Sequence, residues 1–286
     1  MQNTPFSTNK TLNIQGRLMD LSIPKIMGIL NVTPDSFYDG GQFTTEKNIL
    51  DHVEKMVQEG ANFIDVGGYS SRPGAGDLSE GVEKDRVIMA IELILRNFPD
   101  TVISIDTFRS TVAEAAVDAG ASMINDISGG ALDEKMFETA SRMQVPYVIM
   151  HMKGNPQTMN HQVAYTNLMK EIIDYFHEKI NRLQGMDIKD IIIDPGFGFA
   201  KTREHNFHML HHLQSLSILG KPLLVGLSRK SMIWKTLAVE PEEALNGTTA
   251  LNTIALLKGA DILRVHDVKQ AKEVIKLFTS FNDSSS

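Results

Sequence analysis

The sequence contains no cysteine among its 286 residues. This absence excludes a disulfide scaffold, thiolate metal sites, iron–sulfur clusters and a cysteine nucleophile. The sequence also lacks any uninterrupted apolar stretch of roughly 20 residues, the length that spans a bilayer. The first ten residues have no apolar core of the kind found in secretory signals. We therefore expect a soluble, cytoplasmic protein with no membrane partner.

Basic residues are outnumbered, because 28 lysines and arginines face 35 aspartates and glutamates, for a formal net charge of −7. This balance argues against a general nucleic-acid binder. An anionic ligand would have to be bound locally by a few placed cations. The charged fraction of 22% is that of an ordinary globular chain and excludes a fully disordered one.

One pattern recurs along the chain: a short apolar run ends in a polar or glycine-containing turn, and a longer amphipathic segment follows. There are eight such runs, at 26–30, 63–66, 102–105, 122–125, 147–150, 191–193, 223–227 and 262–265. Apolar residues in the intervening segments recur at three- and four-residue intervals, which predicts helices at 46–59, 82–97, 110–119, 164–183, 204–213, 242–258 and 268–278. Strands and helices that alternate in this way predict a parallel sheet covered by helices.

Eight strand–helix units in one chain of this length fit an α/β fold, a single (β/α)₈ TIM barrel. We expect the barrel at residues 23–280, a frayed tail at 281–286, and an N-terminal extension at 1–22 as a candidate hairpin under the barrel. A doubly wound sheet would need a switch point in the strand order, and no stretch of the sequence predicts one.

Polar side chains follow the predicted strands at their carboxyl ends, where barrel enzymes carry their active sites. These residues are Asn31, Asp65, Asp106, Asn125, His151, Asp194, Ser228, Lys230, Arg264 and His266. The opposite strand ends, such as Ala61 and Pro222, carry no comparable groups. This asymmetry predicts an enzyme.

Asp106, Asn125 and Asp194 are predicted to project inward from three different strands. Two carboxylates and an amide suit the edge of a heterocycle that offers several donors and acceptors. The alternative is that each residue caps the helix that follows it. For any one of them the two interpretations are equally good, and the three together favour a site.

Cations gather in the last third of the sequence, at Lys230, Arg264 and His266, with Arg72 on the second loop. Cations in a cleft need anionic partners, and the loops after the last two strands of such barrels commonly bind phosphate. For Arg109 and Arg229 we expect ordinary surface salt bridges. Asn31 could ligate Mg²⁺ alongside phosphate oxygens, because Mg²⁺ takes few protein ligands.

Five segments of the chain resemble dihydropteroate synthases: GILNVTPDSF at 28–37, SRPGA at 71–75, IIIDPGFGF at 191–199, LSRKS at 227–231 and ILRVHD at 262–267. Motifs of this length, in this order, are far more specific than a lone glycine pattern. The resemblance implies a folate-pathway transferase that condenses 6-hydroxymethyl-7,8-dihydropterin diphosphate with 4-aminobenzoate, giving 7,8-dihydropteroate and diphosphate. It also implies Mg²⁺, a homodimer and inhibition by sulfonamides.

Carried over position by position, the resemblance implies roles for individual residues. Pterin diphosphate is expected at Ser71, Asp106, Asn125, Asp194, Lys230, Arg264 and His266. The 4-aminobenzoate pocket is expected at Phe37, Pro73, Phe199 and Ser231, and Mg²⁺ at Asn31. Catalytic roles are expected for Asp35, Arg72, Asp106 and Lys230. Two positions depart from the family pattern: Tyr69 stands where Glu is common, and Ser71 where Thr is common.

Three alternatives are weaker. A methyltetrahydrofolate methyltransferase shares the pterin-binding barrel, but it should lack the TPDSF and SRKS segments present here. A non-catalytic paralogue would bind pterin without turnover, although only two matched positions, 69 and 71, depart from the family. An unrelated phosphate-binding barrel, such as a sugar-phosphate isomerase, does not account for the trio of Asp106, Asn125 and Asp194.

Overall fold

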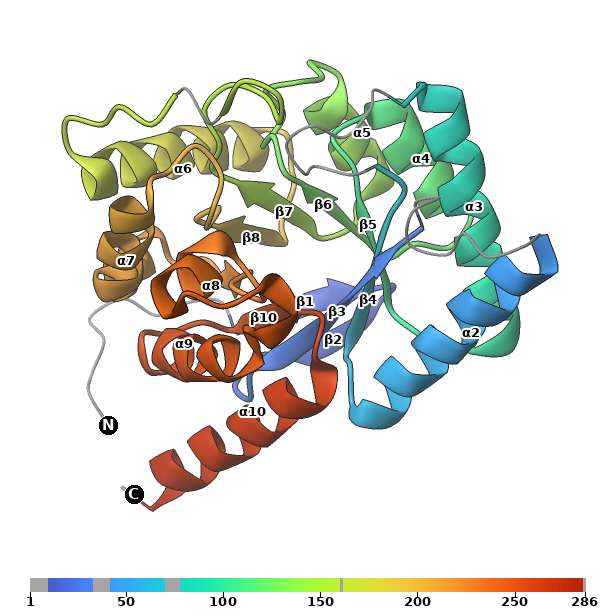
Figure 1. Ribbon diagram of the computed structural model, residues 1–286. Coiled ribbons are helices and arrows are strands. Elements are labelled where there is room, and N and C mark those ends of the chain that lie inside the picture. Colours follow the sequence, from blue (N-terminus) through green and yellow to red (C-terminus); the bar gives the residue numbers. More distant parts are fainter. Residues whose placement is uncertain (1–9, 33–41, 70–77, 160–161, 285–286) are drawn as a thin grey trace.

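The strands of the computed structural model, which describes residues 10–32, 42–69, 78–159 and 162–284, form a barrel surrounded by helices (Figure 1). Eight parallel strands lie in the order β8-β7-β6-β5-β4-β3-β10-β9. They are β3 (Lys25–Asn31), β4 (Phe63–Gly67), β5 (Ile103–Asp106), β6 (Met123–Asp126), β7 (Tyr147–Met150), β8 (Ile191–Asp194), β9 (Leu224–Val225) and β10 (Ile262–Val265). A parallel bridge between Ile193 and Leu223 joins the two outer strands. The predicted (β/α)₈ barrel is confirmed.

The helices lie outside the strands (Figure 1). They are α2 (Gln42–Glu59), α3 (Glu80–Asn97), α4 (Ser110–Asp118), α5 (Met136–Met143), α6 (Leu168–Gly185), α7 (Arg203–His211), α8 (Ser231–Leu237), α9 (Leu245–Leu257) and α10 (Val268–Asp283), with 3₁₀ turns η2 (Leu213–Leu219) and η3 (Pro241–Glu243). None of the helices in the described parts of the chain is both long and apolar enough to cross a membrane.

Helix α6 illustrates why the amphipathic segments take this form. Asn167 precedes it, and the side chain of Asn167 accepts a hydrogen bond from the Lys170 amide, which satisfies a free N–H of the first turn. Ile172, Phe176 and Ile180 recur at four-residue spacing and are buried in the main core. Each buried side chain of this size stabilises the fold by about 1.5–3 kcal/mol.

Several elements differ from the ranges that the sequence predicts. Helix α5 fills one of the eight predicted strand–helix units but lies outside the predicted helical ranges, because eight residues are too few for a helical period to stand out. Strand β9 has only two residues of the expected five, because the chain leaves the ladder at Gly226. Helix α10 continues to Asp283 rather than fraying after residue 280, since its polar last turn contains no proline or glycine to end it.

Strands β1 (Thr11–Ile14) and β2 (Arg17–Asp20) form an antiparallel hairpin. Leu12, Ile14 and Leu21 are buried against the side chains near the amino-terminal ends of the barrel strands, including Met27, Phe63, Met123 and Ile262. The hairpin therefore covers the amino-terminal end of the barrel with an apolar layer.

Candidate active site

The strand register brings four residues to one level at the carboxyl end of the barrel. Asn31 pairs with Gly67, Gly67 with Asp106, and Asp106 with Asn125 in neighbouring parallel strands. Parallel strands place their carboxyl ends at one edge, so three predicted site residues stand side by side around the glycine.

Arg264 joins these strands across the barrel. Its Nε donates to Asp65 Oδ2 at 2.6 Å, and its Nη2 donates to Asp106 Oδ2 at 2.5 Å. Asn125 Nδ2 donates to the same Asp65 oxygen at 3.0 Å. Asp65 is fully buried, and its other oxygen, Oδ1, has no hydrogen-bond partner among the described residues. Asp65 thus fixes the orientation of both the guanidinium and the amide.

Asp65, Asp106 and Arg264 carry charges that are largely removed from water, which costs desolvation free energy. Burial and the neighbouring carboxylates of Asp65 and Glu83 raise the pKa of Asp106, while Arg264 acts in the opposite direction. Burial opposes the charge of Arg264, but Asp65 and Asp106 outweigh it and raise its pKa. Buried charges persist only when they are paired and hydrogen-bonded, so the three groups depend on one another.

The helix-capping alternative fails for two residues of the trio. Helix α4 begins after Arg109 with no side-chain cap, while Asp106 binds Arg264 instead. In the following strand it is Asp126, not Asn125, that accepts the amides of its own loop, from Ser128 and Gly130. Asp106 and Asn125 therefore face other strands rather than their own helices.

Asp194 and Lys230 form a second part of the same end of the barrel. Asp194 Oδ1 accepts the Gly196 amide at 2.8 Å, and burial raises the pKa of Asp194. Lys230 precedes α8, and its Nζ lies 4.3 Å from the centroid of the Phe199 ring. Burial and the charge of Arg264 lower the pKa of Lys230 to about 8, against the attraction of Asp194.

The remaining basic residues have distinct partners, and burial together with the charge of Arg264 lowers the pKa of His266 to about 4, so its imidazole is neutral. His266 Nδ1 lies 3.0 Å from Ser228 Oγ. Arg229 makes a two-pronged ion pair with Asp267, at 3.0 and 2.7 Å, and its own side chain is one-third exposed. The expectation of a surface salt bridge is wrong for Arg109, because its partner Glu83, 2.6 Å away, is fully buried.

Tyr69 connects three loops at this end of the barrel. Its ring lies edge-on to Phe108, with ring centroids 5.3 Å apart, and the Arg109 guanidinium carbon is 5.5 Å from its centroid. Its hydroxyl accepts a hydrogen bond from Gln157 Nε2 at 3.2 Å. The segment after β4 is thereby tied to the segments after β5 and β7, which accounts for a tyrosine at this position.

Sequence reasoning missed a buried pair, Lys201 and His151. Lys201 Nζ lies 3.0 Å from His151 Nδ1, and both residues are almost wholly buried. Burial and the charges of Lys201 and Lys153 lower the pKa of His151 to about 2, so this imidazole is neutral. The sequence marks His151 only as the end of a strand, and a lysine after a glycine-rich segment gives no signal of burial.

The oxygen atoms around Asn31 suit a cation such as Mg²⁺ that takes most of its ligands from a substrate and from water. A Cβ built on Gly67 would lie 3.6 Å from Asn31 Oδ1 and 3.7 Å from Asp106 Oδ2, so two oxygens converge on space that the glycine leaves open. Within the described ranges, no group of three or more His, Cys, Asp or Glu residues could hold a metal ion. Mg²⁺ needs no such cage, because it keeps waters and binds through one or two protein oxygens and phosphates.

Other predicted residues are placed less closely or not at all. Ser231 is exposed as the first residue of α8, and Phe199 is half-buried in the segment after β8. Five predicted residues lie outside the described residues: Asp35, Phe37, Ser71, Arg72 and Pro73.

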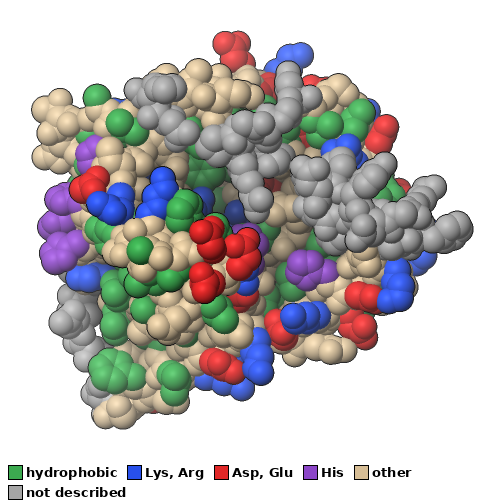
Figure 2. Space-filling view, in the orientation of Figure 1, with side chains coloured by type: hydrophobic (Ala, Val, Ile, Leu, Met, Phe, Trp, Pro, Cys, Tyr) green, Lys and Arg blue, Asp and Glu red, His purple; other side chains and the backbone are tan. Residues whose placement is uncertain are grey.

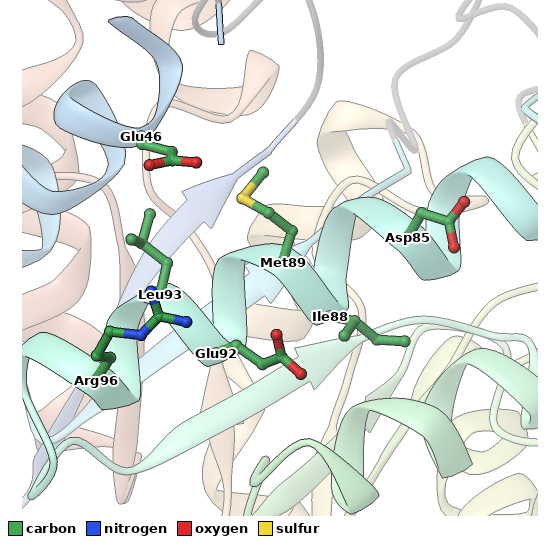
Figure 3. Close-up of a pocket in the computed structure, with 7 residues that line it drawn as sticks. All are labelled: Glu46, Asp85, Ile88, Met89, Glu92, Leu93 and Arg96. Atoms are coloured by element: carbon green, nitrogen blue, oxygen red, sulfur yellow. The ribbon is translucent and has the colours of Figure 1, made fainter. Parts of the chain in front are cut away.

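Two surface features lie elsewhere. A hollow of about 260 Å³ opens on the outside of the barrel between α2 and α3, and Glu46 faces Met89, Leu93 and Arg96 across it (Figure 3). Figure 2 shows histidines gathered where α7 lies in Figure 1; this helix and its C-cap carry the exposed His208, His211 and His212. Neither feature includes a residue of the charged cluster at the carboxyl end.

These observations define a class of protein. A (β/α)₈ barrel whose carboxyl end combines carboxylates, an amide and cations is a barrel enzyme for a polar heterocycle that carries an anionic group.

Comparisons with known proteins define the family. Residues 27–266 match the family described as "Pterin binding enzyme". The chain is 43% identical over 269 residues to dihydropteroate synthase of Escherichia coli K12, covering 92% of this chain and 93% of the relative. Yersinia pestis dihydropteroate synthase, solved with a sulfonamide drug, superposes with a TM-score of 0.89 at 41% identity, covering 96% of this chain and 99% of that one. The Xanthomonas albilineans enzyme, solved with 4-aminobenzoic acid, also has a TM-score of 0.89, at 37% identity and the same coverage.

The chain belongs to the dihydropteroate synthase family. The predicted family, fold and enzyme class are confirmed: this is a pterin-binding transferase of folate biosynthesis.

Proposed function

We propose that the carboxyl end of this barrel joins the methylene carbon of 6-hydroxymethyl-7,8-dihydropterin diphosphate to the amine of 4-aminobenzoate. One observation carries the assignment of residues: Arg264 bridges Asp65 and Asp106 beside Asn125, so acceptors for a heterocycle and a cation for a diphosphate share one cluster. The solved relatives with 4-aminobenzoic acid and a sulfonamide support the choice of second substrate.

The pterin ring lies against Asp106, Asn125, Asp194 and Lys230. Asn125 Nδ2 donates one hydrogen bond to Asp65, and Asn125 Oδ1 accepts no hydrogen bond from a described residue. Asp194 uses only Oδ1 internally, on the Gly196 amide. The free oxygens accept from the N–H groups of the pterin, while Lys230 donates to a ring acceptor.

The diphosphate lies against Arg264 and His266, with Ser71 supplying a hydroxyl. Arg264 commits Nε and Nη2 to carboxylates, and its Nη1 makes no hydrogen bond within the described part of the chain. That nitrogen donates to phosphate oxygens, and the planar guanidinium is already held in place by Asp65 and Asp106.

Asn31 would hold Mg²⁺, together with oxygens of the diphosphate. Its Oδ1 faces the open space at Gly67, near Asp106 Oδ2. The bound cation would neutralise charge on the leaving group.

The reaction is a substitution at the methylene carbon. Its bond to the diphosphate oxygen breaks, a bond to the amine nitrogen forms, and the amine loses one proton to solvent. Positive charge that builds on the pterin methylene is stabilised by the carboxylates of Asp106 and Asp35. Arg72 and Lys230 stabilise the departing negative charge, and no covalent bond to the protein forms.

The 4-aminobenzoate ring packs against Phe199, Phe37 and Pro73, and Ser231 binds its carboxylate. Phe199 is half-buried beside Lys230, which supports an aromatic contact close to the pterin. A sulfonamide shares the aniline ring of this substrate and competes for the same surface.

A homodimer forms through α9 and α10. These helices pack on each other and carry four exposed large apolar side chains, Ile254, Leu257, Leu277 and Phe281. Leu277 and Phe281 share one helix face, as do Ile254 and Leu257. We expect Leu277→Glu to halve the sedimenting mass, while Ile218→Glu, an exposed apolar position on η2, leaves it unchanged. A cytoplasmic location stays a prediction from the sequence.

The proposed reaction is tested by omission. Diphosphate release from dihydropterin diphosphate is measured with and without 4-aminobenzoate and with and without Mg²⁺, and dihydropteroate is followed by chromatography. Release in step with dihydropteroate, and only when both are added, supports the proposal. Pterin binding without turnover would contradict it and leave a non-catalytic paralogue.

Asn31→Ala tests the metal assignment separately. We expect the Mg²⁺ concentration for half-maximal rate to rise about tenfold or more, a loss of at least about 1.4 kcal/mol of binding free energy. An unchanged Mg²⁺ dependence would remove Asn31 from the metal site.

A further inference from the structure

Lys201 is a buried lysine that has no part in the proposed reaction. It contacts the backbone of the Gly196–Phe199 segment. Lys201 follows Ala200 in the connection from β8 to α7, and it is only 8% exposed. Burying an ammonium group costs free energy unless it is fully hydrogen-bonded. Here burial lowers the pKa of Lys201 to about 7, despite the opposing attraction of Asp194.

The hydrogen-bond contacts of Lys201 are to backbone carbonyls and to an imidazole nitrogen rather than to a carboxylate. Its Nζ donates to the carbonyl oxygens of Phe199 at 2.9 Å, Gly196 at 3.0 Å and His151 at 3.2 Å. His151 Nδ1 lies 3.0 Å from the same nitrogen. Lys201 therefore joins the segment after β7 to the segment after β8.

One of the residues that Lys201 holds is Phe199, whose ring contacts Lys230. The Phe199 carbonyl is fixed by Lys201, while the Phe199 ring lies 4.3 Å from Lys230 Nζ. Gly198 adds to the tight fit, because a Cβ there would lie 3.2 Å from Lys230 Cδ. The Gly196–Phe199 segment is also held from α7, where Asn206 Oδ1 accepts a hydrogen bond from the Gly198 amide at 2.7 Å.

We propose that Lys201 is a positioning residue for the second substrate: it holds the Phe199 backbone so that the Phe199 ring meets 4-aminobenzoate beside Lys230. This inference rests on the proposed function, which places Phe199 against that substrate. Lys201 touches neither substrate. Its loss should weaken binding of 4-aminobenzoate much more than binding of the pterin, because the pterin also contacts Asp106 on β5 and Asn125 on β6.

The test compares Lys201→Met, which keeps the length of the side chain and removes its donors, with Lys189→Met. Lys189 is an exposed control that reaches Asp187 only at 4.0 Å. The Kd of dihydropterin diphosphate is measured by titration without 4-aminobenzoate, and the KM for 4-aminobenzoate is measured at saturating pterin and Mg²⁺. We expect Lys201→Met to raise this KM about tenfold, which is about 1.4 kcal/mol, with the pterin Kd changed less than about twofold. Equal effects on both constants, or no effect on either, would overturn the proposal.

A double-mutant cycle with Phe199→Leu tests the route of the effect. If Lys201 acts through Phe199, Lys201→Met adds little to the KM for 4-aminobenzoate once Phe199 is leucine. Additive effects would show that Lys201 acts elsewhere. Lys201→Gln, which keeps one donor group, should recover part of the lost affinity, and it replaces the methionine variant in the cycle if that variant does not fold.

The wild-type reaction separates this inference from the proposed function. If wild-type protein forms no dihydropteroate, the proposed function fails. If it does and the cycle is additive, only the positioning role fails.

Discussion

The amino-terminal end of the barrel is closed by apolar side chains, whereas the carboxyl-terminal end is lined by charges. At the first end, Leu12, Ile14 and Leu21 of the hairpin region pack on the strand starts. At the second, Arg264, whose side chain is 20% exposed, lies between Asp65 and Asp106. Apolar burial stabilises a fold directly, while a buried ion cluster costs desolvation energy. The amino-terminal end therefore contributes mainly to stability and the carboxyl-terminal end to chemistry. Substitutions at the first end should lower the free energy of unfolding alone, and those at the second should also lower kcat/KM.

Removing Arg264 should have the largest effect, because Arg264→Met leaves the fully buried Asp65 and the partly buried Asp106 without their cation. We expect the free energy of unfolding to fall by about 3–5 kcal/mol and kcat/KM to fall by about a thousandfold or more. Arg229→Met removes a more exposed pair and should cost about 1 kcal/mol or less. Denaturant unfolding and the diphosphate-release assay measure both effects. An active, fully stable Arg264→Met protein would show that the cluster is not essential.

At the opposite end, Leu12→Ala should reduce stability without changing the chemistry. Leu12 is fully buried, so we expect a loss of about 2–5 kcal/mol in the free energy of unfolding. The exposed Leu18 of the same hairpin is the control, and Leu18→Ala should change stability by less than about 0.5 kcal/mol. Measured well below the melting temperature, kcat/KM of Leu12→Ala should equal that of the wild type. A selective loss of kcat/KM would break the separation between the two ends.

The buried neutral His151 makes the carboxyl end sensitive to acid. Its folded-state pKa is lowered to about 2 from an ordinary 6.5, so the unfolded chain binds the extra proton as the pH falls below 6.5. This contribution to stability is present above pH 6.5 and is lost towards pH 2. Between pH 6.5 and 5 the loss is about 2 kcal/mol.

His151→Asn should remove that part of the pH dependence. Denaturant unfolding of both proteins at pH 7 and pH 5 gives the comparison, since the other titrating groups are common to the two. If both lose the same free energy between these pH values, His151 is not buried in the neutral form.

Tyr69→Phe should have the smallest effect. It removes only the hydroxyl that accepts from Gln157 and keeps the ring contacts with Phe108 and Arg109. We expect a change in kcat/KM of less than about threefold, in keeping with one partly exposed hydrogen bond. Steady-state kinetics suffice, and a loss of a hundredfold would assign Tyr69 a direct part in the reaction.

Much of the fold could be predicted because the apolar runs and helical periods are local properties. The carboxyl-end residues Asp106, Asn125 and Arg264 could also be found, since strand ends in a barrel converge on one rim. The ion pair of Arg109 with a buried carboxylate could not, because Glu83 comes from α3, which is distant in the sequence. Lys201 was missed for a related reason: its acceptors lie partly on the segment after β7, which only the closed barrel brings close.

Hydrogen exchange with and without dihydropterin diphosphate and Mg²⁺ tests the central claim most directly, because it reports on both ends of the barrel at once. We expect added protection in the segments that follow β5, β6 and β8 and around Lys230 and Arg264, with no change in the hairpin at 11–20. Protection of the hairpin with none at the carboxyl ends of the strands would contradict the account.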